Sequence, residues 1–171
     1  FKKDILNLVY LSEYFGLPSV ASFWNEVVKL NNWHQHRIAQ LITKKLFGTL
    51  SGKKIAILGF AFKSNTNDTR ESAAIQICKD LLEEGASLYI HDPQVSEKQI
   101  EIDLNLKPCG NTEEQSHKMD GTWQSMKSIN EGLTNADAAV ILTEWGEYKK
   151  INWIEVSKKC EAPHGYLIQD L

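Results

Sequence analysis

The stretch that most constrains the fold of this chain is residues 53–92, KKIAILGFAFKSNTNDTRESAAIQICKDLLEEGASLYIHD. It opens with the apolar run Ile55–Leu58, and a short run bounded by lysines and a glycine is typical of a strand buried on both faces. An apolar repeat with helical spacing comes next and ends at Gly85, after which Ser87–His91 reads as a second strand. This order predicts a βαβ unit of a parallel sheet.

The polar turn between the first strand and the helix is where a ligand is expected, because ligands of open α/β sheets bind beyond the carboxyl ends of the strands. Asp68 and Glu71 have the spacing of a capping box, which predicts that the helix begins there and that Arg70 lies in its first turn. Lys63 and Arg70 beside a helix N-terminus would suit a phosphate-bearing ligand. Their positions are equally compatible with two solvated loop cations.

The usual dinucleotide fingerprint is absent, because Gly59 is followed by Phe60, Ala61 and Phe62 rather than by further glycines. The sequence therefore disfavours the ordinary pyrophosphate grip at this turn. Asp92 at the end of the second strand resembles a ribose-binding acid, but without the glycines a turn-forming role is favoured.

The remainder of the chain alternates short apolar and helical segments, which predicts further strands and right-handed crossovers. We expect strands over Glu101–Leu106, Ala138–Leu142 and Tyr166–Ile168, the second of them buried. Helices are expected over Trp123–Leu133 and Tyr148–Lys159, with a helical turn over Val95–Gln99 and a long surface loop over Lys107–Gly121.

Two helical patterns precede the βαβ unit. Asp4–Phe15 predicts a first helix, and a second begins after a Ser19 cap and extends to Gly48. Asn31 and Asn32 interrupt the second pattern, so it predicts either one long helix or two. Its apolar surface exceeds what a small domain needs, and either subunit association or packing on a further domain would cover it.

Composition excludes several classes of function. A net charge of −3 argues against a general nucleic-acid binder, and no apolar run approaches the roughly 20 residues of a membrane span. Three widely spaced cysteines and five histidines show no metal-ligand spacing, so no metal site is expected. No signal peptide is visible, which favours a cytoplasmic location, and a chain that begins at Phe1 without Met reads as a piece of a longer protein.

Two separated motifs carry a resemblance to a known family. ILGFAFK followed by T-x-D-T-R-E-S resembles the start of the C-terminal, UDP-binding domain of UDP-glucose 6-dehydrogenases. The first residues, FKKD followed by ILNLVYL, resemble the segment directly after the catalytic cysteine of that family, in the pattern G-G-S-C-F-x-K-D. The resemblance covers nearly the whole chain and is weakest over Cys109–Ser128.

The resemblance implies a Rossmann-like α/β fold, with residues 1–50 as part of a helical linker and dimerisation segment and residues 51–171 as the UDP-sugar-binding domain. It implies an NAD-dependent enzyme that oxidises UDP-glucose to UDP-glucuronate in two steps through a cysteine thiohemiacetal and thioester. It also implies a homo-oligomer with a dimer as its building block, for which a hexamer is one possible assembly. The nucleophilic cysteine would precede Phe1, so we expect this chain alone to be inactive.

The resemblance also assigns residues. Asp4 matches the acid that activates the hydrolytic water, although capping the first helix is an alternative role. Phe62 and Lys63 match the pair that contacts the nucleotide sugar. Arg70 matches an arginine that reaches NAD, and Phe1 and Lys3 lie where the family also contacts NAD. The substrate-binding arginine that the family carries after a final Asp-Gly has no counterpart, because the chain ends at Asp170-Leu171.

Two other functions stay open at this point. The chain could be a self-standing nucleotide-binding or oligomerisation module without catalysis, or part of a dehydrogenase for another nucleotide sugar. Sequence upstream of Phe1 would separate the first alternative from the enzyme.

Overall fold

The computed structural model describes residues 2–109, 121–159 and 166–168, and its chain divides into two compact units, residues 1–38 and 39–171. The elements have the order α1 (Lys2–Tyr14), α2 (Pro18–Lys45), β1 (Lys54–Leu58), α3 (Ala73–Glu83), β2 (Ser87–His91), α4 (Glu97–Leu104), β3 (Thr122–Ser125), α5 (Ile129–Leu133), β4 (Ala138–Ile141), η1 (Tyr148–Lys150), α6 (Trp153–Lys159) and β5 (Tyr166–Ile168). The predicted boundary at residue 50 stays a prediction.

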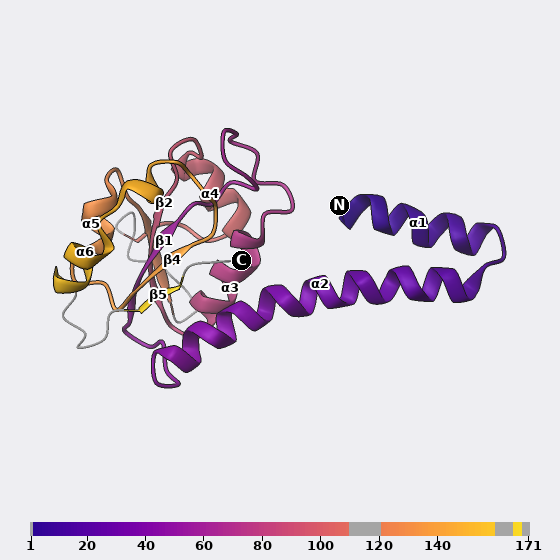
Figure 1. The fold of residues 1–171 in the computed structure, drawn as a ribbon, viewed down its shortest axis with the longest axis horizontal. Helices are drawn as coiled ribbons and strands as arrows, with labels where there is room; N and C mark the ends of the chain where they lie inside the picture. Colours follow the sequence, from indigo (N-terminus) through magenta and orange to yellow (C-terminus); the bar gives the residue numbers. More distant parts are fainter. Residues whose placement is uncertain (1, 110–120, 160–165, 169–171) are drawn as a thin grey trace. The chain divides into compact units, whose positions relative to one another are not determined.

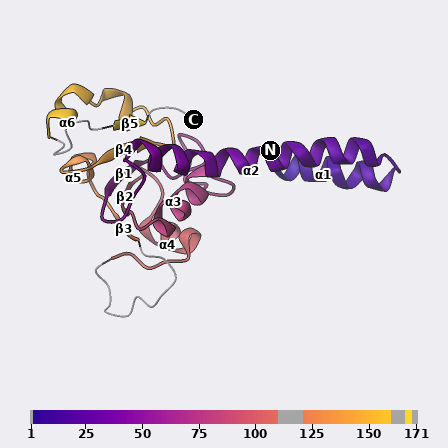
Figure 2. The same cartoon turned by 90° about the horizontal axis from the view of Figure 1, so that it is seen from below.

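The first unit is a helical hairpin, in which α1 folds back along α2 (Figures 1 and 2). The turn between them uses Gly16 at φ +70°, and the backbone N–H of Leu17 donates to the carbonyl of Ser12 at 2.8 Å. α2 begins at Pro18, so the predicted Ser19 cap is wrong; proline suits a first helical turn because its missing N–H has no acceptor there. Of the two alternatives for the second pattern, one continuous helix is confirmed.

The second unit is built on a five-stranded parallel sheet with strand order β3-β2-β1-β4-β5. β1 is central, and Ile55, Ala56, Ile57 and Leu58 are fully buried, which confirms the strand that the apolar run predicts. Parallel neighbours need crossover connections, and helices supply them here. The α/β fold class is confirmed.

Helices cover both faces of this sheet (Figure 1). α3 and α4 lie on one face, and α3 buries the predicted apolar residues Ala74, Cys78, Leu81 and Leu82. α5 and α6 lie on the other, where a cluster of small and branched side chains joins them to β1 and β4. The helices that follow β1 and β2 lie on one face of the sheet, and those that follow β3 and β4 lie on the other. The strand order therefore reverses between β1 and β4. This reversal is the topological switch point at which doubly wound sheets bind ligands.

Three predicted elements after β2 are wrong in whole or in part. Glu101–Leu106 is not a strand, because a helix starts at Glu97 behind the Ser96 cap and buries Ile100 and Leu104 at helical spacing. Of the helix predicted over Trp123–Leu133, only the last five residues form one, as α5, and Trp123 lies in β3, an edge strand in which it alone is buried. The predicted helix Tyr148–Lys159 divides into η1 and α6, because Ile151 is extended at φ −69°, ψ 127°.

The other elements of this part of the chain agree with the predictions. β2, β4 and β5 are confirmed, and α4 accounts for the helical turn predicted over Val95–Gln99. Most of the loop predicted over Lys107–Gly121 lies outside the described residues, as does Cys160. Within the described ranges, no helix combines the length and the apolarity that crossing a membrane requires.

Candidate functional site

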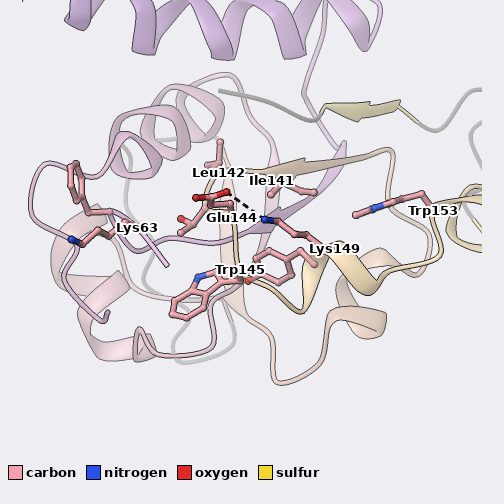
Figure 3. Close-up of a pocket in the computed structure, with 10 residues that line it drawn as sticks. Lys63, Ile141, Leu142, Glu144, Trp145, Lys149 and Trp153 are labelled. Carbon is pink, nitrogen blue, oxygen red and sulfur yellow. Dashed lines mark ion pairs between the residues drawn. The ribbon is translucent and has the colours of Figure 1, made fainter. Parts of the chain in front are cut away.

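A pocket of about 540 Å³ opens at the carboxyl ends of β1 and β4, at the switch point (Figure 3). The loop after β1 contributes Phe62 and Lys63, and the end of β4 with its following loop contributes Ile141–Trp145. Tyr148 and Lys149 of η1 and Trp153 of α6 complete the lining. The pocket therefore combines aromatic side chains with ammonium groups from two different loops.

Close backbone contacts hold the two loops together. Gly59 has φ +95°, and a Cβ placed on it would lie 2.5 Å from the Cβ of Thr143, so only glycine fits this position. The hydroxyl of Thr143 donates to the carbonyl of Ala61 at 2.6 Å. Phe60 and Ala61 are buried, and Phe62 is the first side chain of the loop to be exposed. These backbone contacts place Phe62 and Lys63 in the lining of the pocket.

Arg70 lies in the turn before α3 and not in its first helical turn, so this prediction is wrong. α3 starts at Ala73, and the hydroxyl of its cap Ser72 accepts from the N–H of Ala74 at 3.3 Å. The predicted capping box fails because Glu71 has φ +61°, which a helical residue cannot adopt. Arg70 is therefore a loop cation, in agreement with the alternative interpretation.

The guanidinium of Arg70 is bound to the carboxylate of Asp68. Nε donates to Oδ1 at 2.9 Å and Nη2 donates to Oδ2 at 2.7 Å, and the backbone N–H of Arg70 also donates to Oδ1. These hydrogen bonds lower the pKa of Asp68 to about 2. The carbonyl of Asp68 accepts from the N–H of Phe62 at 2.8 Å. One residue thus links the loop that carries Phe62 and Lys63 to Arg70.

An exposed ion pair lies within the pocket lining. The ammonium of Lys149 is 3.6 Å from the carboxylate of Glu144, and both side chains are largely exposed. An exposed pair of this kind contributes little net free energy, so a ligand anion can replace Glu144 as the partner of Lys149. A planar ring that carries phosphate groups would find both aromatic surface and cations here.

Tyr148 lines the pocket and forms, with the buried His91, a pair of side chains that is uncharged at neutral pH. The hydroxyl of Tyr148 donates to the carbonyl of His91 and lies 3.0 Å from its Nδ1, so neutral His91 carries its proton on Nδ1 and donates to that hydroxyl. Burial lowers the pKa of His91, and Glu147 and Asp92 oppose this shift. Burial also raises the pKa of Tyr148. Tyr148 therefore keeps its proton and supports the pocket rather than acting as a base.

The structure brings some of the predicted site residues together. Phe62 and Lys63 line one pocket, and Arg70 lies further along the same loop. Lys3 and Asp4 are exposed residues of α1 in the helical hairpin unit. Phe1 lies outside the described residues.

Sequence reasoning assigned only Phe62 and Lys63 to this site and missed the rest of the lining, including Tyr148, Lys149 and Trp153. These three residues come after β4, and only the strand order places the end of β4 beside the end of β1. The available signal was the apolar run Ala138–Leu142 followed directly by a polar and aromatic turn, which is the pattern of a strand end that faces a ligand.

The family comparisons agree with this geometry. Residues 56–170 match the model of the UDP-glucose/GDP-mannose dehydrogenase family, UDP binding domain. The chain is 40% identical over 169 residues to UDP-glucose 6-dehydrogenase 4 of Arabidopsis thaliana, a match that covers 95% of this chain and 35% of the relative. It is 44% identical over 163 residues to UDP-glucose 6-dehydrogenase of Mus musculus, covering 95% of this chain and 32% of the relative. It thus spans about a third of the length of these relatives.

Solved structures with this fold include more distant dehydrogenases. A UDP-glucose dehydrogenase from Pyrobaculum islandicum superposes with a TM-score of 0.65 at 24% identity, over 98% of this chain and 32% of that chain. A GDP-mannose dehydrogenase from Pseudomonas aeruginosa gives 0.66 at 18% identity, over 96% and 34%. At these identities the likeness concerns the fold alone. By the match of residues 56–170 to its UDP binding domain, the chain belongs to the UDP-glucose/GDP-mannose dehydrogenase family.

Proposed function

We propose that this chain is the nucleotide-sugar-binding part of an NAD-dependent UDP-glucose 6-dehydrogenase, which oxidises UDP-glucose to UDP-glucuronate in two steps. The observation that carries the proposal is the switch-point pocket, which lies within the residues that match a UDP binding domain. The names of the relatives support UDP-glucose as the substrate.

Phe62 and Lys63 are the proposed contacts to the nucleotide sugar. Phe62 is half-exposed at the pocket mouth, where its ring can pack against a base or sugar. The Lys63 ammonium is a compact charge that can meet a phosphate oxygen. Lys149 stands on the other loop of the same pocket, so a diphosphate could meet both cations.

NAD would be held mainly by parts of the enzyme beyond this chain, with Arg70 as one contact. Asp68 occupies Nε and Nη2 of Arg70, and among the described residues none accepts from its Nη1 hydrogens. That exposed group suits an anionic part of NAD, so the residue fits the cofactor. NAD, when bound, supplies the hydride acceptor for each oxidation. Phe1 and Lys3 remain proposed contacts from the resemblance.

Asp4 is the proposed acid for hydrolysis of the thioester, on a cysteine that precedes Phe1. It is an exposed residue in the first turn of α1, where a carboxylate also favours the helix dipole. Without that cysteine and the main NAD site, the chain by itself should be inactive, because catalysis needs these groups positioned together.

We also propose that the hairpin unit associates with another copy of this chain. Large apolar side chains on α1, in the turn after it and on α2 are exposed, among them Tyr10, Tyr14, Phe15, Phe23, Leu30 and Trp33. So many exposed large apolar side chains in one small unit favour an interaction site there. A homo-oligomer built from dimers would bury it.

The pocket can be tested by titrating the full-length protein with UDP-glucose in a calorimeter. Lys63→Ala should raise the dissociation constant about tenfold or more, because a charge-assisted contact contributes about 1.5–3 kcal/mol. Lys98→Ala, which removes an exposed lysine of α4 outside the pocket, is the matched control and should leave it unchanged. An unchanged dissociation constant for Lys63→Ala would refute the pocket as the substrate site.

An assay of NADH formation separates the enzyme from a binding module without catalysis. The full-length protein with UDP-glucose and NAD should form NADH. Binding of UDP-glucose without any formation of NADH would favour the module without catalysis. Oxidation of a different nucleotide sugar would show that the substrate is not UDP-glucose, and the fold and the pocket would stay as described.

A further inference from the structure

Asp92, at the end of β2, is the residue on which both loops of the pocket converge. It is partly buried, does not line the pocket, and has no role in the proposed function. Its carboxylate accepts five hydrogen bonds from three segments of the chain. That number of donors on one carboxylate exceeds what ending a strand requires.

One oxygen of this carboxylate is bound to both pocket loops. Oδ2 accepts from the backbone N–H groups of Phe60 at 2.7 Å and Ala61 at 3.0 Å, directly before Phe62 and Lys63. The same oxygen accepts from the indole Nε1 of Trp145 at 3.2 Å, and Trp145 lines the pocket from the loop after β4. Asp92 therefore fixes a backbone segment on one side of the pocket and a ring on the other.

The second oxygen anchors Asp92 to its own loop. Oδ1 accepts from the N–H groups of Gln94 at 2.9 Å and Val95 at 3.0 Å. All five partners are donors, so an ionised carboxylate satisfies them and an amide would not. The Asp92 carboxylate is thus anchored to its own loop through Oδ1 and binds the two pocket loops through Oδ2.

The same contacts support the prediction that the turn after β1 is not a dinucleotide site. In a dinucleotide-binding fold, the N–H groups at this turn face the pyrophosphate. Here Phe60 and Ala61 donate to Asp92, so a carboxylate of the protein already occupies those donors. A phosphate-bearing ligand is directed instead to the next side chains of the loop, beginning at Phe62.

We propose that Asp92 is a positioning residue for nucleotide binding, which sets the distance and orientation between Phe62-Lys63 and Trp145 before the ligand arrives. This inference rests on the proposed function and extends it. When Phe62-Lys63 and Trp145 are already held in place, ligand binding has a smaller entropic cost, because these side chains need not be ordered at that step.

The experiment uses the full-length protein and UDP as the probe. Asp92→Ala should raise the dissociation constant of UDP about tenfold or more, since the loop that carries Phe62-Lys63 and the ring of Trp145 each lose a charge-assisted contact. Trp145→Phe keeps an aromatic ring and removes only the indole N–H, so it should raise the constant by a smaller factor. If Asp92→Ala does not fold, Trp145→Phe carries the test.

Asp137→Ala is the matched control at the opposite end of the sheet. Asp137 is also partly buried and accepts from the N–H of Lys54 at 2.9 Å and from the ammonium of Lys53 at 3.0 Å. Both alanine variants should lower the melting temperature, but only Asp92→Ala should weaken UDP binding. Equal weakening by both, or wild-type affinity in Asp92→Ala or in Trp145→Phe, would overturn the inference.

Hydrogen exchange of the nucleotide-free protein separates this inference from the proposed function. Asp92→Ala should speed exchange in the peptide that contains Phe60 and Ala61, and Asp137→Ala should not. If exchange changes in this way while the wild-type protein fails to bind UDP, Asp92 holds the loops as inferred and the proposed function fails. Unchanged exchange in Asp92→Ala would overturn the inference whatever the affinity.

Discussion

The two units of this chain use apolar residues in opposite ways. In the α/β unit the apolar side chains of β1 and most of those of α3, including Ile77, Leu81 and Leu82, are fully buried, and the pocket at the strand ends carries lysines and aromatic rings. In the hairpin unit the described buried residues are few and include Ser12, Ala21, Val28 and Ile38, while many large apolar side chains are exposed. The difference agrees with the proposal that another copy of this chain covers the hairpin unit, whereas the α/β unit has a core of its own.

The largest expected effect comes from the core of the α/β unit. Ile57 is fully buried in the central strand, so Ile57→Ala should lower the free energy of unfolding by about 2–5 kcal/mol. Ile102→Ala on α4 removes a side chain that is 61% exposed and should change it by less than about 0.5 kcal/mol. Urea denaturation measures both, and similar values would mean that the core has been misassigned.

In the hairpin unit, apolar substitutions should act on association rather than on folding. Phe23 and Leu30 are exposed and share one face of α2 at a spacing of seven residues. Replacing both with serine should weaken self-association by about 3 kcal/mol or more, if each side chain is buried between copies. Sedimentation of the full-length protein measures this, with Ile102→Ser as the control.

If the protein with both hairpin substitutions sediments with the mass of the wild-type oligomer, the proposed association through the hairpin unit is wrong. The exposed apolar face would then be covered by something other than a second copy of α2.

A smaller effect concerns the pH dependence of stability in the α/β unit. The pKa of His91 is lower in the folded protein than in the unfolded chain, so below about pH 6.5 the unfolded chain binds more protons. The contribution of His91 is therefore complete above this pH and is lost as pH falls through the folded pKa, with a slope of at most about 1.4 kcal/mol per pH unit.

Denaturation of wild type and His91→Asn at pH 7.5 and 5.5 measures this contribution. The variant should lose less stability than wild type on going to the lower pH. The same loss in both proteins would place the proton uptake on another group.

The sequence predicts the fold best where burial leaves a repeating pattern. β1, β2, β4 and the buried face of α3 follow from apolar runs or helical spacing. β3 could not be found in this way, because a four-residue edge strand with one buried side chain has no pattern to detect. The start of α3 was misplaced because a capping-box spacing says nothing about the positive φ of Glu71.

The candidate site was predictable only on one side. Phe62 and Lys63 follow from their place after β1 and from the family resemblance, and they line the pocket. The opposite side depends on which strand is the neighbour of β1, a property of the whole sheet that no local pattern contains. The five hydrogen bonds of Asp92 depend on the same long-range arrangement.

The central claim is that the switch-point pocket of the α/β unit binds the nucleotide. A crystal structure of the full-length protein with UDP tests it most directly. We expect density for UDP between Phe62-Lys63 and Trp145, at the carboxyl ends of β1 and β4, with a phosphate oxygen within hydrogen-bonding distance of the Lys63 ammonium. UDP bound elsewhere, with this pocket filled only by water, would contradict it.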